Sequence, residues 1–450
     1  MKVAIIGAGW AGCAAAVEAT RLGYQVTIFE ASRIAGGRAR RVMATVNGLP
    51  VALDNGQHIL IGAYAETLQL MNDVGVDEPT SLLRLPLTML FPDGSGVKLP
   101  DWPAPLDAVA GILNARGWPL ADKLSLLKVA LGWRLGGFVC QPSQSVSDLC
   151  SGLAPGVMAA LIEPLCVSAL NTPPERASGQ VFLRVLRDAL FAQSGGSNLL
   201  LPRRDLSALL PDASLAWLQA HGGVQRLGVR VQSLAPAGPG WTVDGEAFER
   251  VVLACPPIEA ARLVQGRGIA ADAWLAQTRG LRHEALATVY VHAPQARLSQ
   301  PMLALRANAA QPAQFVFDRA QLGGPAGLLA FVVSASIGDA ATLTAQVQPR
   351  PRGSWSLRIC SRCRRLWKNA PPFPARRACS GPTCRSPTAC WPAGTTLPGR
   401  IRQRWKARCA PGLRQPAACA DTLLLPPVCY LINSYRRLPN GRFKHFLPSI

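Results

Sequence analysis

A glycine-rich turn near the N-terminus constrains the fold of this chain more than any other stretch. Lys2 to Ile6 is a short apolar run that predicts a buried strand. The glycines that follow have the spacing G-x-G-x-x-G: Gly7, Gly9 and Gly12. A helical pattern covers 14–22, and residues 25–29 predict a second strand that ends at Glu30. In this order of strand, turn, helix and strand, the spacing indicates a dinucleotide-binding βαβ unit.

Each position of this turn has a physical role in holding a dinucleotide. Gly7 permits the tight turn, Gly9 lets the backbone approach a pyrophosphate, and Gly12 lets the helix pack closely on the strand. Ala8, within the same turn, is predicted to contact the cofactor as well. The N-terminus of the helix offers free N–H groups and the positive end of its dipole to the phosphates. Glu30 is predicted to accept hydrogen bonds from the adenosine ribose.

A second glycine-rich element narrows the expected cofactor to FAD. Gly36, Gly37 and Arg38 follow Glu30 by a few residues, which is typical of flavoproteins that bind FAD and not of nicotinamide dehydrogenases. The glycines permit another close backbone approach, and the guanidinium suits a pyrophosphate. The N-terminal residues do not predict a secretory signal, because Glu18 and Arg21 interrupt their apolar run and a strand follows.

The composition differs sharply between two parts of the chain. Residues 350–450 hold 20 of the 47 Lys and Arg residues, eight of the 13 cysteines and one of the 26 acids, so the formal net charge of +21 is concentrated there. The preceding residues have nearly balanced charge and scattered cysteines, as expected in a reducing cytoplasm. No apolar stretch approaches the roughly 18 residues that span a bilayer. We therefore expect a cytoplasmic protein that is soluble or peripheral at a membrane.

Hydrophobic patterns predict an α/β protein. Helical patterns cover 64–74, 123–135, 156–170, 175–192 and 207–221. Strand patterns cover 88–91, 97–99, 228–234, 241–243, 250–254, 284–292 and 327–334. In a flavoprotein, a strand such as 250–254 would return the chain to the first sheet. We predict a discontinuous FAD-binding domain and a mixed α+β substrate domain with a helical insertion, comprising residues 1–85 with 205–268, and residues 86–204 with 269–345.

Four stretches further along the chain resemble one family. They are Asp54-Asn55-Gly56-Gln57-His58, Glu163-Pro164-Leu165-Cys166, the run ALNTPPERAS at 169–178, and the run from Leu199 to Ser207. Over about residues 1–340 the chain is similar to the hydroxysqualene dehydroxylases, within the phytoene desaturase and amine oxidase superfamily. The resemblance implies an FAD-binding dinucleotide fold and a lipophilic isoprenoid substrate. It also implies a reaction, the reduction of hydroxysqualene by flavin hydride to give squalene for hopanoid or sterol synthesis.

This implied reaction needs a proton donor. An allylic alcohol that ionises leaves a delocalised cation, so the protein must protonate the leaving hydroxyl and keep water away from the cation. Asp54 and His58 belong to the segment expected beside the flavin ring, where a carboxyl or an imidazolium could donate this proton. The same residues could instead only hold a turn around Gly56, which is predicted as a flavin contact. Val231 is a candidate for a backbone contact with adenine, or an ordinary strand residue.

The basic tail admits two interpretations. Four cysteines have a spacing close to that of a four-cysteine zinc site: Cys360, Cys363, Cys379 and Cys384. Together with the neighbouring arginines, this spacing suggests a nucleic-acid-binding module. The stretch lacks the strand alternation of a zinc ribbon, however, and its Arg, Pro, Cys and Trp content resembles GC-rich DNA translated out of register. We therefore predict no metal site and no nucleic-acid partner, and we interpret 346–450 as an out-of-frame tail, disordered or non-native.

The shifted register can be read from the codons. When the last base of each codon is joined to the first two of the next, Cys390–Pro392 must encode Leu-Ala, and both Trp367–Lys368 and Trp405–Lys406 must encode Glu. Residues 390–412 then permit LAGGDYT and, further on, YPATLEGAVR, similar to the C-terminal flavin motif of the family. We predict a single frameshift between about 335 and 367, and weak or absent FAD binding by the chain as written.

Other functions remain open from the sequence alone. Among enzymes, a carotenoid or phytoene desaturase is the alternative within the same superfamily. From other classes, the chain could be an inactive frameshifted remnant, or a flavin fold that carries a basic zinc or nucleic-acid-binding arm. The sequence makes no prediction of the oligomeric state.

Overall fold

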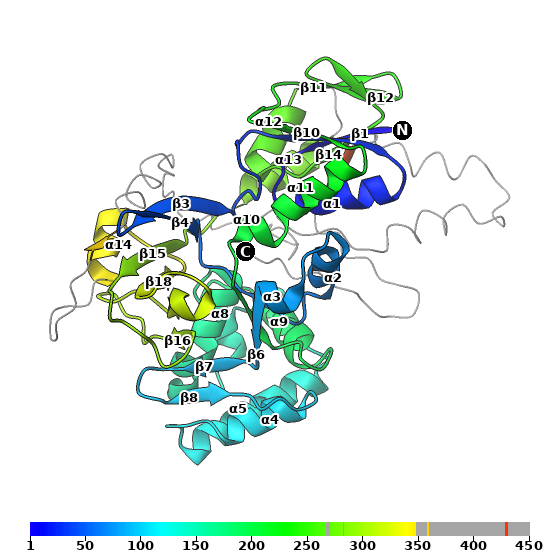
Figure 1. The fold of residues 1–450 in the computed structure, drawn as a ribbon. Helices are drawn as coiled ribbons and strands as arrows, with labels where there is room; N and C mark the ends of the chain where they lie inside the picture. Colours follow the sequence, from blue (N-terminus) through cyan, green and yellow to red (C-terminus); the bar gives the residue numbers. More distant parts are fainter. Residues whose placement is uncertain (267–270, 282, 348–357, 360–427, 431–450) are drawn as a thin grey trace.

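The fold is known from a computed structural model that describes residues 1–266, 271–281, 283–347, 358–359 and 428–430. Within these residues the chain forms two lobes, joined by strands and loops that run between them (Figure 1). The expected α/β fold is confirmed. The predicted out-of-frame tail and the cysteine pattern lie almost entirely outside the described residues, and the domain boundaries remain predictions.

A five-stranded parallel sheet forms the upper lobe. Its strands, in spatial order, are β10 (Val224–Leu227), β2 (Gln25–Glu30), β1 (Lys2–Ile6), β14 (Arg250–Leu253) and β20 (Val428–Tyr430). β1 is central and pairs with β2 on one side and β14 on the other. Its apolar run suits this position because a central parallel strand is buried on both faces. The predicted strands at 2–6, 25–29 and 250–254 are confirmed.

The two faces of this sheet bury different side chains of β1. Val3 and Ile5 pack with the helices α1 (Trp10–Arg21) and α11 (Pro211–Ala220). Ala4 and Ile6 pack on the opposite side, in a core with Trp241. That second core is built by α12 (Pro257–Val264), α13 (Asp272–Gly280) and a small antiparallel sheet of β11 (Leu234–Ala237), β12 (Gly240–Val243) and β13 (Glu246–Phe248). The alternation along one strand therefore holds both layers of helices in place.

One predicted strand, 228–234, is wrong. Gly228 adopts a positive φ of 76° directly after β10, and regular pairing resumes only at Leu234. Between them, the backbone N–H groups of Gln232 and Ser233 donate to the carboxylate of Asp244, at 2.9 and 2.7 Å. A side chain from the neighbouring hairpin thus satisfies the donors that a strand partner would otherwise have taken.

An antiparallel sheet forms part of the second lobe. Its order is β16 (Met302–Ala304), β17 (Phe315–Asp318), β18 (Leu328–Val333), β15 (Ala287–His292) and β19 (Arg358–Ile359). One face packs on a long hairpin of β3 (Arg41–Val46) and β4 (Leu49–Asp54), and α14 (Ala340–Val347) covers residues of the other. The hairpin leads directly from the glycine-rich segment into the stretch around Asp54, so it carries that stretch against the antiparallel sheet (Figure 1).

Helices and two small sheets complete the second lobe. The sheets are β5 (Leu60–Ile61) with β9 (Leu199–Pro202) and β6 (Leu82–Leu85), and β7 (Thr88–Leu90) with β8 (Gly96–Lys98). The larger helices are α2 (Ala65–Asp73), α4 (Leu106–Leu113), α5 (Leu120–Leu135), α8 (Glu163–Leu170) and α9 (Gly179–Leu190). The shorter ones are α3 (Glu78–Ser81), α6 (Val146–Leu149), α7 (Pro155–Val157), a π-turn at Met158–Ile162, α10 (Leu206–Leu209) and a 3₁₀ turn at Arg319–Leu322. No helix among the described residues is long and apolar enough to cross a membrane.

Candidate functional site

The turn between β1 and α1 has a backbone that only glycine accommodates. Gly7 has a φ of 109°, and a Cβ at this position would lie 2.7 Å from the carbonyl oxygen of Ala254. A Cβ at Gly12 would lie 1.8 Å from the carbonyl oxygen of Gly7. The last glycine therefore lets the first turn of α1 pack directly against the end of β1, as the spacing predicts.

The second glycine pair closes over the first. The N–H of Gly36 donates to the carbonyl of Ala8 at 2.8 Å, and Gly9 and Gly36 form a parallel bridge. A Cβ added to Gly9 would have only one neighbouring residue within 4 Å among the described atoms, the Cα of Gly37 at 3.9 Å. Open space thus lies over the backbone at the N-terminus of α1, where the N–H groups of the first turn have no helical partner. This cradle fits a pyrophosphate.

Glu30 lies at the same turn, at the end of β2. Its carboxylate accepts hydrogen bonds from the N–H of Ala8 at 2.9 Å and from the N–H of Ser32 at 2.8 Å. These bonds fix the carboxylate beside the glycine cradle and leave lone pairs for a ribose hydroxyl. Arg38 follows the second glycine pair, and burial lowers the pKa of its guanidinium. The structure therefore brings the predicted ADP-binding residues together; their contact with a cofactor stays a prediction.

Val231 is buried beside α12. Its carbonyl accepts a hydrogen bond from Arg262 Nη2 at 2.7 Å. Since a carbonyl oxygen has two lone pairs, this bond leaves room for a second donor. The expected contact with adenine stays a prediction.

Asp54 is a buried carboxylic acid at the end of β4. Only 3% of its surface is exposed, and its Oδ1 accepts a hydrogen bond from the N–H of Leu206 at 2.7 Å. Burial raises the pKa of this carboxyl from 3.8 to about 7, although the Leu206 bond and the positive charge of Arg319 oppose the rise. Asp54 thus holds a proton over much of the range below neutral pH. Its bond to the first residue of α10 also gives it a clear scaffolding contact.

The pKa of His58 is shifted in the opposite direction, downwards. Burial, and secondarily the charge of Arg38, lowers the pKa of its imidazole to about 4. The ring lies over Gly56, where an added Cβ would be 2.8 Å from His58 Cε1. A histidine with this pKa is neutral near pH 7, so its imidazolium is not available there as an acid. Of the two acid candidates, Asp54 alone carries a proton close to neutral pH.

Two buried nitrogens beside Asp54 have no protein partner. Among the described residues, neither Gln57 Nε2 nor His58 Nδ1 forms a hydrogen bond. Buried polar atoms are normally satisfied, so orphaned ones indicate a missing ligand or water. Together with the open cradle over Gly9, they fit a dinucleotide cofactor that extends from the turn towards this segment.

Three residues that the sequence analysis did not single out hold the Asp54 segment in place. Tyr290 donates its hydroxyl to the carbonyl of Asp54 at 3.1 Å and accepts from the N–H of Asp54 at 3.3 Å. Thr288 Oγ1 accepts from the N–H of Gln57 at 3.1 Å, and Arg319 Nη1 donates to Gln57 Oε1 at 3.3 Å. The sequence could have identified Thr288 and Tyr290, because their spacing along a predicted strand places two polar groups on one face of the sheet.

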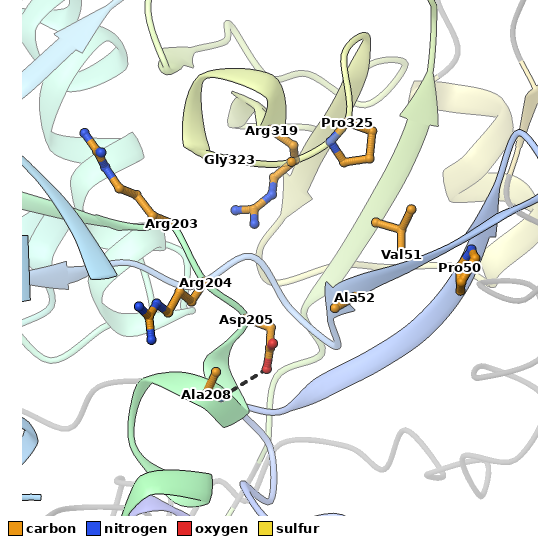
Figure 2. A pocket seen from close by; sticks show the side chains of 11 residues that line it. Pro50, Val51, Ala52, Arg203, Arg204, Asp205, Ala208, Arg319, Gly323 and Pro325 are labelled. Carbon is orange, nitrogen blue, oxygen red and sulfur yellow. Dashed lines mark hydrogen bonds between the residues drawn. The ribbon is translucent and has the colours of Figure 1, made fainter. Parts of the chain in front are cut away.

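A pocket lined by both charged and apolar residues lies beside β4 (Figure 2). Its volume is about 630 Å³, and it is lined by β4, by the stretch Arg203–Asp205, and by the 3₁₀ turn that begins at Arg319. Asp205 is already engaged, since it forms an ion pair with Arg41 at 3.2 Å and caps α10. None of the predicted cofactor-binding residues lines this pocket. This pocket is therefore separate from the residues predicted to bind the cofactor.

Comparison with known proteins identifies the family to which the chain is similar. The family described as flavin containing amine oxidoreductase matches residues 10–342. A hydroxysqualene dehydroxylase of Rhodopseudomonas palustris is 30% identical over 291 residues, which cover 59% of this chain and 64% of that protein. The match therefore spans less than two thirds of that relative's length. A zeta-carotene desaturase of a Synechocystis species is 38% identical over 78 residues, 17% of this chain and 15% of that protein.

The solved structures support the fold. An oxidoreductase of Methanosarcina mazei superposes with a TM-score of 0.56 at 17% sequence identity, and the alignment covers 74% of this chain and 78% of that one. This likeness shows the fold and agrees with the predicted α/β architecture.

Proposed function

The chain belongs to the flavin containing amine oxidoreductase family, and we propose that within this family it reduces hydroxysqualene to squalene with FAD as its cofactor. The observation that carries the FAD assignment is the glycine cradle, closed by Gly36 and flanked by the fixed carboxylate of Glu30. The substrate assignment is supported by the similarity to the Rhodopseudomonas palustris protein and by the motifs around Asp54 and Asn171.

The residues present would hold FAD in two places. Gly7 to Gly12 and the helix N-terminus suit the pyrophosphate, and Glu30 suits the adenosine ribose. The orphaned nitrogens of Gln57 and His58 suit the polar edge of a flavin ring. When bound and reduced, the flavin supplies a hydride, which replaces the hydroxyl that leaves as water.

The chain's own contribution is a proton and a dry environment. The balance of the reaction is one proton and one hydride taken up for each hydroxyl lost as water. We propose Asp54 as the proton holder, because it is buried in the segment expected beside the flavin and burial raises the pKa of its carboxyl to about 7, whereas the pKa of His58 is lowered to about 4. Burial of the Asp54 segment against β15 excludes water from this carboxyl.

Asn171 shows how a second family motif supports the site. It ends α8 with a φ of 47°, and its side chain bridges the segment before β15 and the segment after β18. Nδ2 donates to the carbonyl of Glu284 at 2.9 Å, and Oδ1 accepts from the N–H of Ala335 at 2.7 Å. The motif therefore anchors the helices of the second lobe to the ends of β15 and β18, which is a positioning role.

The experiment that tests this function is product analysis under anaerobic conditions. Purified chain is supplied with FAD, a chemical reductant and hydroxysqualene, and squalene formation is followed by mass spectrometry. A parallel incubation with phytoene and an oxidant tests the carotenoid desaturase alternative, which the zeta-carotene desaturase match favours. Squalene formation supports the proposal. Desaturated phytoene without squalene replaces it with the alternative.

The proposed reading frame of residues 346–450 determines which chains this assay must include. We propose that residues 346–450 are translated out of frame and that the flavin-facing half of the cofactor site is therefore missing from the chain as written. The assay accordingly includes a second chain, in which the reading frame is restored between about codon 335 and codon 367. Squalene from the restored chain alone supports both proposals. Equal activity of the two chains supports the reaction and refutes the frameshift.

A further inference from the structure

The surface of the helices α4 and α5, which we call the α4–α5 face, carries an unusual concentration of exposed apolar side chains. Nine of the nineteen large apolar side chains that the described residues expose fall within residues 102–139: Trp102, Leu106, Val109, Leu113, Leu120, Leu124, Leu131, Leu135 and Val139. Both helices lie side by side at the lower edge of the molecule, remote from the parallel sheet (Figure 1). Such a concentration marks an interaction surface, since scattered apolar residues need no explanation but grouped ones do.

Helix α5 is apolar on two opposite faces. Its inner face packs into the helical core through buried Leu126, together with Val129 and Trp133. Its outer face carries four exposed leucines, which fall within an arc of about 60° when the helix is viewed along its axis: Leu120, Leu124, Leu131 and Leu135. Core packing explains the first face only. The second face has no packing partner among the described residues.

Helix α4 repeats this arrangement. Leu106, Val109 and Leu113 are exposed and also fall within an arc of about 60°. Trp102, just before the helix, is 55% exposed. Tryptophan is enriched at the boundary between lipid and water, because its ring is apolar and its N–H is polar.

The charges around these stripes are mostly positive. On α5, Lys128 borders one side of the leucine stripe, and Lys123 and Arg134 border the other. Arg116, between the helices, is exposed, and within the described part of the chain neither Arg116 nor Lys128 forms an ion pair.

The acids nearby do not balance this charge. Asp107 is buried, and Asp122 points towards Gly156 on the inner side of α5, where an added Cβ would meet its Oδ2 at 2.7 Å. Asp101 is the one exposed acid within residues 101–139. An apolar stripe with basic side chains on both flanks is the pattern of a helix that lies in a membrane interface.

We propose that the α4–α5 face docks onto a membrane that contains anionic lipids. The flanking charges decide between the possible occupants. The tail of this chain, residues 350–450, is strongly basic and would be repelled by the basic flanks. A second copy in a symmetric contact would bring the same basic flanks together. A bilayer with anionic headgroups satisfies both the apolar stripes and the basic flanks. The proposal concerns the surface and does not depend on the reaction assigned above.

The test is flotation of the purified full chain with lipid vesicles. The vesicles are phosphatidylcholine with about 30 mol% phosphatidylglycerol, because this anionic content provides the negative surface potential that basic side chains sense. The variant is L124E/L131E, which changes two exposed side chains of the stripe. The matched control is I258E/I337E, since Ile258 and Ile337 are 69% and 89% exposed and lie outside the face. Binding is measured at about 0.1 M and about 0.5 M salt, because the higher concentration screens adsorption of the basic tail.

We expect the vesicle-bound fraction of L124E/L131E to fall at least tenfold at the higher salt, with I258E/I337E equal to the unmodified chain. Hydrogen exchange should slow in α4 and α5 when vesicles are added to the unmodified chain. The proposal is overturned if binding disappears at the higher salt in every chain, because the apolar stripes would then contribute no binding of their own. It is also overturned if both variants lose binding equally, or if the face instead mediates a concentration-dependent dimer that L124E/L131E abolishes.

Discussion

The buried carboxyl of Asp54 makes the stability of this protein depend on pH in a direction that can be worked out. Replacing Asp54 with Asn keeps the shape of the side chain and an oxygen that accepts from the N–H of Leu206. It removes only the ability to ionise. The D54N variant therefore separates the cost of burying a charge from the benefit of the hydrogen bond.

The magnitude follows from the two pKa values. The unfolded chain carries this carboxyl with its ordinary pKa of 3.8, and the folded chain with a pKa of about 7. As the pH rises, the carboxyl of the unfolded chain loses its proton first. The free energy of unfolding therefore falls between pH 3.8 and about pH 7, and this carboxyl lowers it no further above that range. The full penalty is on the order of 4 kcal/mol. Between about pH 5 and about pH 8, the free energy of unfolding of D54N should therefore rise by about 2–3 kcal/mol relative to the unmodified chain.

The assay is urea unfolding, followed by circular dichroism at several pH values in this range. The control is D93N, because the pKa of exposed Asp93 is lowered by hydrogen bonds from Ser95 and Arg306, which puts its titration below the range. Its difference from the unmodified chain should not change with pH. The reasoning is refuted if the D54N difference is equally flat, or if D54N is the less stable chain at about pH 8.

Two further substitutions and one titration test other parts of the site. G12V should lose more than about 3 kcal/mol of stability, and in the chain with its frame restored also its FAD binding, because its Cβ would lie 1.8 Å from the carbonyl oxygen of Gly7. The control G132A, at a helix position where an added Cβ has no neighbour within 4 Å, should gain about 0.5–1 kcal/mol. Equal unfolding curves for the two variants would contradict this reasoning. Y290F should lose about 1–3 kcal/mol in the same urea assay, because the backbone of Asp54 loses its buried partner; an unchanged midpoint would show that this hydroxyl is dispensable. The ring of His58 should stay neutral in NMR titrations down to about pH 5, since its pKa is lowered to about 4; a midpoint near 6.5 would contradict its burial.

Local chemistry made the N-terminal unit predictable. β1 and β2 match their predicted ranges to within a residue, because an apolar run next to a glycine-rich turn admits few alternatives. The helix begins at Trp10 and not at residue 14, because the turn glycines themselves enter its first turn. Likewise, α9 begins at Gly179 and not at residue 175, because the side chain of Ser178 caps it. These errors concern ends of elements, which depend on single hydrogen bonds.

Contacts between residues far apart in the chain could not be predicted from the sequence. Asp54 was identified as a candidate, but its partners Leu206 and Tyr290 lie 152 and 236 positions away along the chain. Whether its carboxyl ionises depends on that surrounding structure, since burial sets its pKa. The strand predicted at 228–234 failed for the same reason, because Asp244 takes the hydrogen bonds of that segment. Sequence patterns predict helices and strands, whereas the hydrogen-bond partners that set the chemistry of a side chain are known only from the fold.

The most direct test of the whole account is the stoichiometry of FAD bound by the chain as written and by the chain with its frame restored. Both are purified with added FAD, freed of excess cofactor, and measured by flavin absorbance per protein. The account predicts little or no flavin on the chain as written, because the C-terminal flavin motif is proposed to lie in the out-of-frame residues 346–450, and one flavin per restored chain. A yellow chain as written, with one flavin per molecule, would contradict it.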